Sequence, residues 1–368
     1  MIGIRQAAII EKFYQNFKNS IYNFVPENNN IKLTEFQKAL FGENVYQQNE
    51  AFNNWMYKNR PSNKCYYCVQ DGKVVGQQSA ISMCLKFGDK QINAAYAVDL
   101  RIRSDWKMKG LGVALMASLM HEYDVIIGIG VSDEAYKMFM RQGWFDLGLI
   151  NALVKPLNMR GFNHKGFYSG IIPWLKYVLA LPLSRLSNCY RNLLSFFNKG
   201  DFRKISCFTD EHEDLMNKIY SPDIISFVKD KAYFNWRYLE FPENENYESY
   251  ELIENNKPVA FFITYMLSTQ KCDVMIISEI HSQKSHLGQV VDEIVRLAIS
   301  KNACRITYSG LDNDILRILK SRLFFNRPYG ERFLVFSKYP DIEPILREKS
   351  NWRICGADSD AEFYLLNK

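Results

Sequence analysis

Hydrophobic residues recur along the chain in an order that is the same in its two halves. β-rich apolar runs come first, a helical stripe with a period near 3.6 follows, and another short apolar run comes next. In the first half these runs lie at 65–70, 94–102, 113–120 and 124–129. In the second half they lie at 247–253, 274–280, 290–298 and 305–308. This order predicts an α/β fold made of two similar units, each a mixed sheet flanked by helices.

A short aromatic motif opens each unit. Asn54-Trp55 and Asn235-Trp236 are each followed by a proline six residues after the tryptophan. Because the motif occurs in both halves, we expect the tryptophans to pack in the core rather than to bind a ligand. Asp71-Gly72 and Asn255-Asn256 follow, and both pairs favour tight hairpins because these residues tolerate positive φ.

The repeat divides the chain into an N-terminal unit at 1–157, a helical connector at 158–200 and a C-terminal unit at 201–368. The segment 170–199 is apolar, aromatic and basic, so it either covers apolar surface between the units or lies on a membrane surface. We favour the connector. Its apolar run contains Lys176 and is bounded by Pro173 and Pro182, which leaves it too short to span a bilayer.

Composition and charge narrow the class of protein. The chain has 368 residues, of which 47% are hydrophobic and 23% charged, and this excludes a disordered or fibrous chain. The 46 Lys and Arg against 40 Asp and Glu leave a net charge of +6, too mild to indicate a nucleic-acid partner. Eight cysteines without a signal-peptide core predict a reducing, cytoplasmic location. Cys65 and Cys68 lie in one expected strand, where they would point to opposite faces rather than form a metal pair.

The strongest chemical signal is a strand, a turn with two glycines and a helix between residues 98 and 116. Unpaired amides in the first turn of a helix, together with the helix dipole, form an anion site. Lys107 and Lys109 add positive charge there, so we expect the turn at Gly110 and Gly112 to bind a pyrophosphate. It is neither a Walker loop nor a G-x-G-x-x-G fingerprint. A purely structural turn is the alternative.

Two spaced motifs resemble those of the GNAT acyltransferase superfamily. The first is similar to the family's cofactor loop, Arg/Gln-x-x-Gly-x-Gly/Ala, and reads Lys107-x-x-Gly110-x-Gly112. The second is similar to Asn-x-x-Ala-x-x-x-Tyr-x-x-x-Gly-Phe and reads Ser132-x-x-Ala135-x-x-x-Phe139-x-x-x-Gly143-Trp144. The tandem arrangement looks like that of GNAT proteins associated with bacterial surface-polysaccharide biosynthesis.

The resemblance implies that acetyl-CoA, or another acyl-CoA, binds the N-terminal unit, with its pantetheine arm along the strand at 100–103. The implied cofactor-binding residues are Leu100, Arg101, Ile102, Arg103, Lys107, Met108, Lys109, Gly110, Leu111, Gly112 and Val113. The implied reaction is N-acylation of a small amine acceptor, such as the amine of an amino sugar carried on a nucleotide or a lipid. The C-terminal copy, His286-Leu287-Gly288, lacks the paired glycines, so we expect a degenerate unit without a cofactor.

Acyl transfer to an amine requires a proton acceptor, and Asp99 on the strand before the loop is the expected base. The alternative is an Asp–Arg pair on a solvent-facing edge, and a β-bulge would change the facing. The family's tyrosine is Phe139 here, so Tyr136, a water molecule or no group at all protonates the leaving thiolate.

Other polar residues carry weaker signals. His281 is expected on the surface. Asp358 and Asp360 follow a glycine turn and either cap it or bind a sugar or amine, and we favour the cap. Two further functions remain open: a Fem-type aminoacyl transferase, and a CoA-binding scaffold without catalysis.

Overall fold

Two mixed sheets form the centre of the molecule, which confirms the expected α/β fold of tandem units. The computed structural model describes residues 4–25, 31–41, 46–158, 182, 200–242, 244–269, 272–327 and 330–360. The first sheet has the strand order β1 (Ile21–Asn23), β2 (Lys64–Gln70), β3 (Lys73–Phe87), β4 (Lys90–Ile102), β5 (Val125–Ile129), β15 (Arg332–Ser337) and β6 (Phe145–Leu149), and β9 (Ser226–Phe227) pairs with β3. The second has the order β14 (Phe325–Asn326), β7 (Asn151–Pro156), β13 (Arg305–Gly310), β12 (Asp273–Ser282), β11 (Lys257–Ser268), β10 (Tyr247–Glu254) and β8 (Asp201–Lys204).

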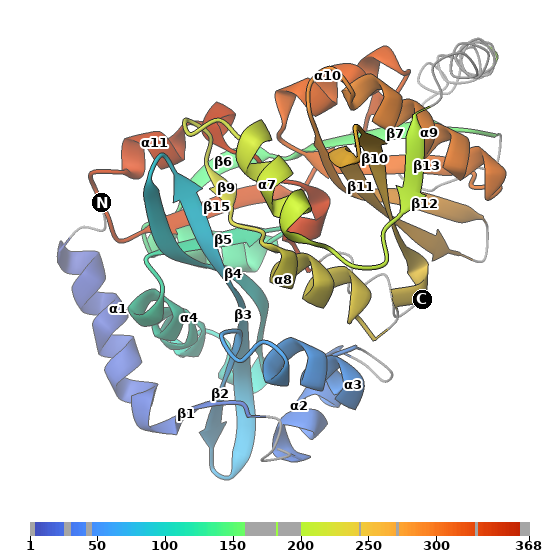
Figure 1. Ribbon diagram of the computed structural model, residues 1–368. Coiled ribbons are helices and arrows are strands. Elements are labelled where there is room, and N and C mark those ends of the chain that lie inside the picture. Colours follow the sequence, from blue (N-terminus) through green and yellow to red (C-terminus); the bar gives the residue numbers. More distant parts are fainter. Residues whose placement is uncertain are drawn as a thin grey trace.

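The two sheets exchange strands. β7 follows β6 after the single buried residue Ile150, yet it pairs with β13 and β14 of the second sheet. β15 comes from the C-terminal half and lies between β5 and β6 of the first sheet. The exchange is visible in Figure 1, where a green strand lies among orange ones and an orange-red strand among green ones. The two units expected from the sequence, before 158 and after 200, therefore do not correspond to the two sheets, because each sheet contains a strand from the other half of the chain.

Helices cover one face of each sheet, and the opposite faces meet in a shared core. α1 (Ile4–Phe17), α4 (Leu111–Glu122) and α5 (Asp133–Arg141) cover the first sheet, while α9 (Leu287–Ser300) and α10 (Asn313–Ser321) cover the second. The other α-helices are α2 (Ile31–Phe41), α3 (Glu50–Asn53), α7 (Asp210–Ile219), α8 (Lys231–Phe234) and α11 (Glu343–Arg347). The shared core joins apolar residues of both halves in one cluster.

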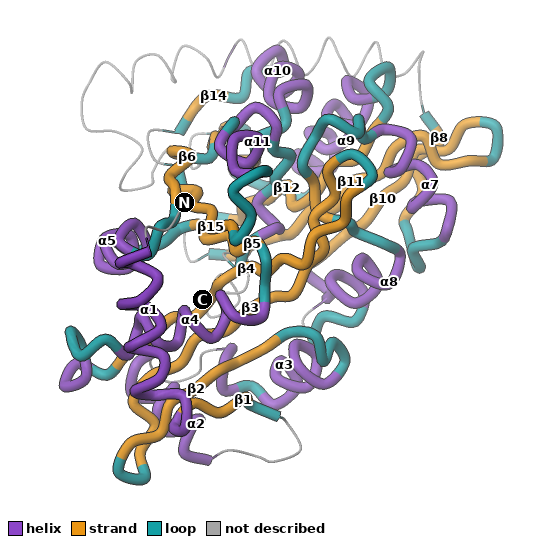
Figure 2. Tube along the Cα trace, turned by 90° about the vertical axis from the view of Figure 1, so that its left-hand side faces the viewer, coloured by secondary structure: helices purple, strands orange, loops and turns teal. Residues whose placement is uncertain are grey.

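The repeated tryptophans meet where the units join, which confirms their expected packing role. Trp55 and Trp236 stack with ring centroids 4.6 Å apart and planes 5° from parallel. Each indole nitrogen donates to the other residue's carbonyl oxygen, at 2.7 Å from Trp55 and 2.9 Å from Trp236. α3 and α8, which precede these residues, lie side by side in both views (Figures 1 and 2). The reciprocal bonds relate the two units by an approximate twofold axis.

The local turns also agree with the sequence. Asp71, Gly72, Asn255 and Asn256 all have positive φ, between 48° and 71°, at the tips of the β2–β3 and β10–β11 hairpins. Cys65 and Cys68 point to opposite faces of β2, where both are buried in different clusters. Burial raises the pKa of the Cys65 thiol to about 12, so it is a core residue.

Other features concern cysteines, membranes and surface charge. Cys272 and Cys304 form a disulfide with Cα atoms 6.0 Å apart, which differs from the expectation for a reducing compartment.

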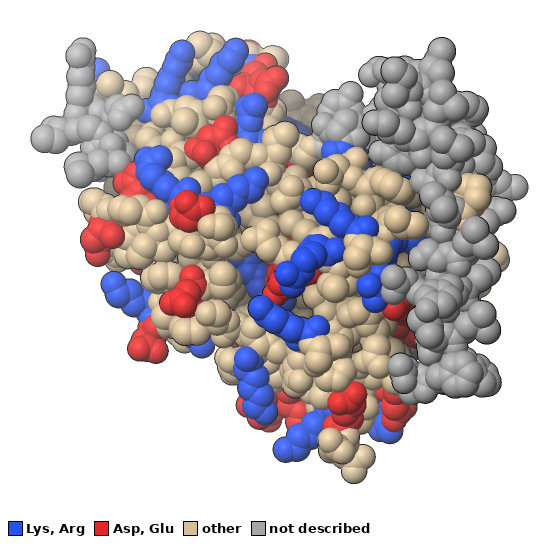
Figure 3. All heavy atoms as spheres, turned by 90° about the horizontal axis from the view of Figure 1, so that it is seen from above, with Lys and Arg blue, Asp and Glu red and all other residues tan. Residues whose placement is uncertain are grey.

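No helix in the described ranges is long and apolar enough to cross a membrane. Nearly all of the expected connector at 158–200 lies outside those ranges. On the face shown in Figure 3, Lys and Arg are interspersed with Asp and Glu over the described atoms.

Candidate functional site

The turn before α4 has the geometry of an anion site. Gly110 is the N-cap of α4 with φ of +83°, and Met108 has φ of +63°. In the described part of the chain, the amides of Leu111, Gly112 and Val113 donate to no acceptor. These groups point out of the first helical turn, where the helix dipole favours a negative charge. The turn can therefore hold an anion through main-chain groups alone.

The side chains around this turn leave its outer side in solvent. Lys107 is exposed and pairs with Glu134 at 3.0 Å, and the Lys109 ammonium lies 4.4 Å from the ring centroid of Trp106. Met108 is 97% exposed. Phe13 of α1 covers the inner side of Gly110, where an added Cβ would lie 2.1 Å from the phenyl ring. Gly110 is therefore required by the backbone and by α1, so its substitution would disturb the fold as well as any ligand.

The strands next to the turn separate. β4 pairs with β5 only from Ala94 to Tyr96, opposite 125–127. Beyond Tyr96, the edge of β4 that faces β5 pairs with no strand in the described ranges, although β3 still pairs with its other edge. An extended ligand with amide groups can hydrogen-bond to such an edge. The expected pantetheine site at 100–103 thus lies on an unpaired strand edge that leads to the start of α4.

The residues expected along this edge have different surroundings. Leu100 and Ile102 pack against the α4 clusters. The Arg101 guanidinium lies 5.0 Å from the ring centroid of Phe41, and Arg103 pairs with Asp105 at 3.1 Å.

Asp99 lies at a β-bulge in β4. Gln77 pairs with Arg101 and Ser79 with Val98, so Asp99 and Leu100 together lie opposite the single residue Gln78. Asp99 has φ of +57°, and its half-buried carboxylate accepts hydrogen bonds from the Tyr46 hydroxyl at 3.2 Å to each oxygen. The bulge changes the facing, as the sequence analysis allowed, and Asp99 points towards Tyr46 in the shared core.

The second unit repeats this bulge with another carboxylate. β12 and β13 begin their parallel pairing at Val274, as β4 and β5 do at Ala94. Glu279 follows Val274 by five residues, as Asp99 follows Ala94, and the β11–β12 register also shifts there. Asp99 and Glu279 are therefore equivalent positions.

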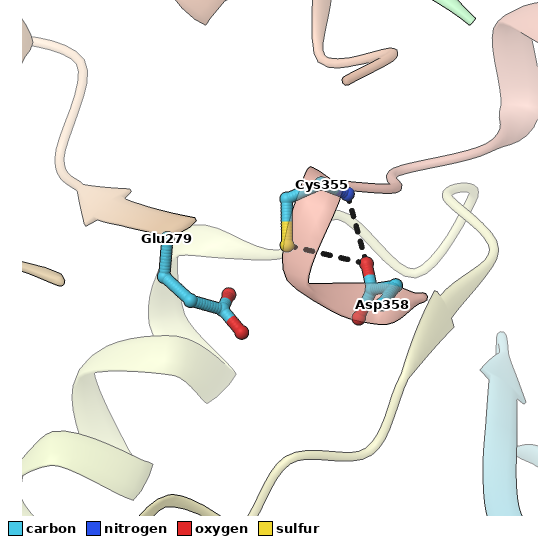
Figure 4. Close-up of side chains that lie close together, drawn as sticks. All are labelled: Glu279, Cys355 and Asp358. Atoms are coloured by element: carbon cyan, nitrogen blue, oxygen red, sulfur yellow. Dashed lines mark hydrogen bonds between the residues drawn. The ribbon is translucent and has the colours of Figure 1, made fainter. Parts of the chain in front are cut away.

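Glu279 belongs to a buried ionic cluster, and Figure 4 shows its side chain directed towards Cys355 and Asp358. The Lys229 ammonium lies 2.8 Å from Glu279 Oε1 and 2.6 Å from Asp358 Oδ1. Glu279 also accepts from the Tyr238 hydroxyl at 2.7 Å and lies 2.8 Å from His281 Nε2. Cys355 Sγ is 3.5 Å from the ammonium and 3.3 Å from Asp358. The donor atoms of Glu279, Cys355 and Asp358 lie within 4.8 Å of one another, but Lys229 contacts all three, so a lysine takes the place a cation would take.

The charges in this cluster stabilise one another. Burial disfavours the Lys229 ammonium, but Asp358, Cys355 and Glu279 outweigh it and hold the pKa of Lys229 well above its usual value. Burial also opposes the Glu279 carboxylate, but Lys229 and His281 lower its pKa below the usual range. Burial lowers the pKa of His281 to about 4 despite the nearby Glu279. At neutral pH the cluster therefore holds the Lys229 ammonium, the Glu279 carboxylate and a neutral histidine, whereas burial raises the pKa of Asp358.

One expectation from the sequence is wrong here, the surface position of His281, and another, the cap by Asp358, is confirmed. His281 is 3% exposed and lies between Tyr220 and Glu279 rather than on the surface. Asp358 accepts the Cys355 amide at 2.8 Å, which is a cap, but it also pairs with Lys229. Lys229 gave no signal in the sequence because its partners lie on distant segments.

The second unit lacks the glycine turn of the first. The cavity beside Glu279, His281 and Tyr308 has a volume of about 20 Å³, room for one water molecule. His286, the N-cap of α9, has φ of −101° where Gly110 has +83°. A Cβ on Gly288 would lie 2.8 Å from the guanidinium of Arg322, so this side chain covers the start of α9.

The candidate acids in the first unit are separated from Asp99. Phe139 is buried and stacks on Trp144 with centroids 4.5 Å apart, so it is a core residue. Tyr136 packs on the α4–α5 side of the sheet, with the Arg332 guanidinium 4.0 Å from its ring centroid. Asp99 bonds Tyr46 on the side of the shared core. The described contacts do not bring Tyr136 and Asp99 together.

The C-terminal tail brings another carboxylate to the first unit. Asp360 follows Asp358 by two residues, and burial together with the charge of Asp99 raises its pKa to about 8. Tyr96 on β4 is 1% exposed, and its hydroxyl has no hydrogen-bond partner among the described residues. Burial and the charges of Asp358, Glu331 and Asp360 raise the pKa of Tyr96. The sequence places Asp360 after a glycine turn but carries no local sign of its link with Asp99.

Comparisons with known proteins show the fold. No protein-family model and no curated sequence matches the chain. Saccharomyces cerevisiae N-myristoyltransferase with bound myristoyl-CoA matches with a TM-score of 0.55 and 14% identity, over 86% of this chain and 82% of that one. A GCN5-related N-acetyltransferase from Anabaena variabilis (0.56, 12%) and a probable N-acyltransferase from Enterococcus faecalis (0.56, 8%) each match over 86% of this chain and 72% of their own. The chain thus shares the fold of these three structures.

Proposed function

We propose that the protein is an acyl-CoA-dependent N-acyltransferase whose donor binds the first unit. The observation that carries this proposal is the unpaired edge of β4 leading to free amides at Leu111, Gly112 and Val113. The edge suits a pantetheine arm and the amides suit a pyrophosphate. The shared fold with N-acyltransferases supports the same assignment.

In the proposed reaction a carbon–nitrogen bond forms between the amine and the acyl carbon, and the carbon–sulfur bond of the thioester breaks. An ammonium acceptor loses two protons. One ends on the departing sulfur, and the other is taken up by the base and released to solvent. Asp99 is the proposed base, and Tyr46 orients its carboxylate. Phe139 cannot supply the proton to sulfur, and Tyr136 remains the residue to test for this step.

Calorimetry with CoA, followed by a thiol-release assay, tests the proposal. We expect one CoA per chain, and turnover with a primary amine and one member of a donor series from acetyl-CoA to myristoyl-CoA. Acetyl-CoA and an amino sugar are the first pair to test. Absence of CoA binding would contradict the proposal in favour of an aminoacyl transferase of the Fem type. Binding without turnover across the series would favour a CoA-binding scaffold.

A further inference from the structure

A carboxyl group from the C-terminal half of the chain lies beside the end of β5. Half-buried Glu331 directly precedes β15, the strand that the second half contributes to the first sheet (Figure 1). Its carbonyl oxygen accepts the Ile150 amide at 2.8 Å, and the carbonyl oxygen of Arg332 accepts the Gly130 amide at 3.1 Å. A Cβ built on Gly130 would lie 3.8 Å from Glu331 Cδ and 3.9 Å from its Oε1. The exchanged strand therefore holds this carboxyl group against Gly130.

Gly130 and Asp99 lie at about the same depth on the two strands that separate. The last residues that β4 and β5 pair are Tyr96 and Ile127. Asp99 follows Tyr96 by three residues, and Gly130 follows Ile127 by three residues. Because β4 and β5 run parallel, Glu331 is placed on the β5 side of the separation as Asp99 is on the β4 side.

The two carboxyl groups also share one face of the first sheet. Phe333 and Val335 of β15 belong to the shared core. Side chains alternate along a strand, so Glu331, two residues before Phe333, lies on the same face. Asp99 bonds Tyr46, which belongs to the same core cluster. The site thus has one carboxyl group on each side of the unpaired strand edge, and both are on the face of the shared core.

The surroundings of Glu331 favour its neutral acid form. Burial raises the pKa of Glu331, and the nearby Arg327 only partly offsets this. In the described part of the chain, Tyr96 and Asp360 are the other titratable groups on which its charge acts. No described residue donates a hydrogen bond to its carboxyl oxygens. A carboxylic acid that keeps its proton is able to act as a proton donor.

We infer that Glu331 is the general acid that gives a proton to the departing sulfur, a step for which Phe139 has no proton and for which Tyr136 is the alternative. This inference rests on the proposed function and adds the proton donor to it. Asp99 takes one proton from the ammonium, and the carbon–nitrogen bond forms. As the carbon–sulfur bond breaks, the carboxyl proton of Glu331 passes to the sulfur. Its carboxylate then takes the second proton that the nitrogen gives up, so the acid is restored.

Parallel variants of the two candidate acids test the inference. Glu331→Gln keeps the shape of the side chain and removes its acidic proton, so thiol release should fall about 10²- to 10⁴-fold. CoA affinity, measured by calorimetry on the same samples, should be unchanged. Tyr136→Phe and the exposed control Glu240→Gln should both keep turnover within about twofold of wild type. Wild-type turnover in Glu331→Gln would overturn the inference, as would an equal loss in Tyr136→Phe.

A second measurement does not depend on turnover. The carboxyl carbons of glutamate are titrated by NMR in the full chain, and the resonance absent from Glu331→Gln identifies Glu331. We expect this carboxyl group to lose its proton at a higher pH than glutamate in the same chain unfolded in urea. A midpoint at or below that of the unfolded chain would overturn the inference, because the acid would have no proton to give. Failure of the proposed function would instead show as absent CoA binding in wild type.

Discussion

The two units share a bulge carboxylate but differ in what lies beside it. In the second unit Glu279 is enclosed by Lys229, His281 and Tyr238, and the cavity next to it has room for one water molecule. In the first unit Asp99 is half-buried beside an unpaired strand edge and a glycine turn with free amides. The same architecture therefore surrounds the carboxylate with charged partners in one copy and leaves it beside an unpaired strand edge in the other.

The two copies also differ at the residue that precedes the helix, Gly110 before α4 and His286 before α9. Gly110 adopts φ of +83°, and the first three amides of α4, like those of α9, have no acceptor among the described residues. His286 has a helical φ at the equivalent place, and Arg322 covers the following glycine while pairing with Asp292 at 3.0 Å. The second copy thus places an ion pair at the start of this helix, where the first copy has Met138, whose sulfur would lie 3.0 Å from a Cβ on Gly112.

The largest effect should come from removing the internal ammonium of the second unit. Lys229→Met would leave Glu279 and Asp358 buried without their counter-ion, a loss of about 3–5 kcal/mol in the free energy of unfolding. Lys231→Met is the control, because that lysine is exposed. Denaturant unfolding measures both. A Lys229→Met variant as stable as wild type would contradict the assigned role of the cluster.

His281 should make the stability of the second unit depend on pH. Its pKa is about 4 in the folded chain and 6.5 in the unfolded chain, so the unfolded state binds more protons between these values. The contribution is complete above pH 6.5 and is lost as the pH falls towards 4, by up to about 3 kcal/mol. His281→Gln should remove this component from unfolding curves measured at pH 4 to 7. If the free energy of unfolding of wild type and of His281→Gln depended on pH in the same way, the contribution of His281 would be excluded.

Asp360 should show the opposite sign. Its pKa is raised to about 8 from 3.8, so its contribution is complete below pH 3.8 and is lost as the pH rises through 8. Asp360→Asn should therefore gain stability relative to wild type between pH 5 and pH 9, by about 1–2 kcal/mol after solvent screening. Thermal unfolding at the two pH values tests this. A relative loss of stability at pH 9 would mean that Asp360 is not repelled by Asp99.

A smaller effect is expected at the turn before α4. Met108 is 97% exposed, so Met108→Glu adds a negative charge near the free amides without touching the core. Repulsion should weaken CoA binding about 5- to 30-fold, on a scale of about 1–2 kcal/mol. Met108→Gln has the same length without the charge and serves as the matched control. Equal CoA affinity of the two variants would place the phosphates elsewhere.

The features predicted correctly from the sequence depend on local residues. Asp71-Gly72 and Asn255-Asn256 determine hairpins through their own φ, and the repeated tryptophans are visible as a motif. The glycine turn was also visible, since it requires only a strand, glycines and a helix in sequence. The proposed ligands of that turn remain predictions.

The features that sequence analysis missed depend on partners chosen in three dimensions. β7 and β15 have the composition of any short apolar strand. Their own residues therefore do not indicate which sheet each strand joins. The burial of His281 and the role of Lys229 follow from Glu279 and Asp358, which meet only after the sheets form. The link between Asp360 and Asp99 has the same origin.

The central claim is that one unit of the pair holds the acyl donor and the other does not. Isothermal titration of the full chain with CoA tests it most directly, with Met108→Glu and Met108→Gln titrated alongside. The account predicts a stoichiometry of one, with weaker binding in Met108→Glu alone. A stoichiometry of two CoA molecules per chain, or no binding, would contradict the claim. Equal CoA affinity of Met108→Glu and Met108→Gln would contradict it as well.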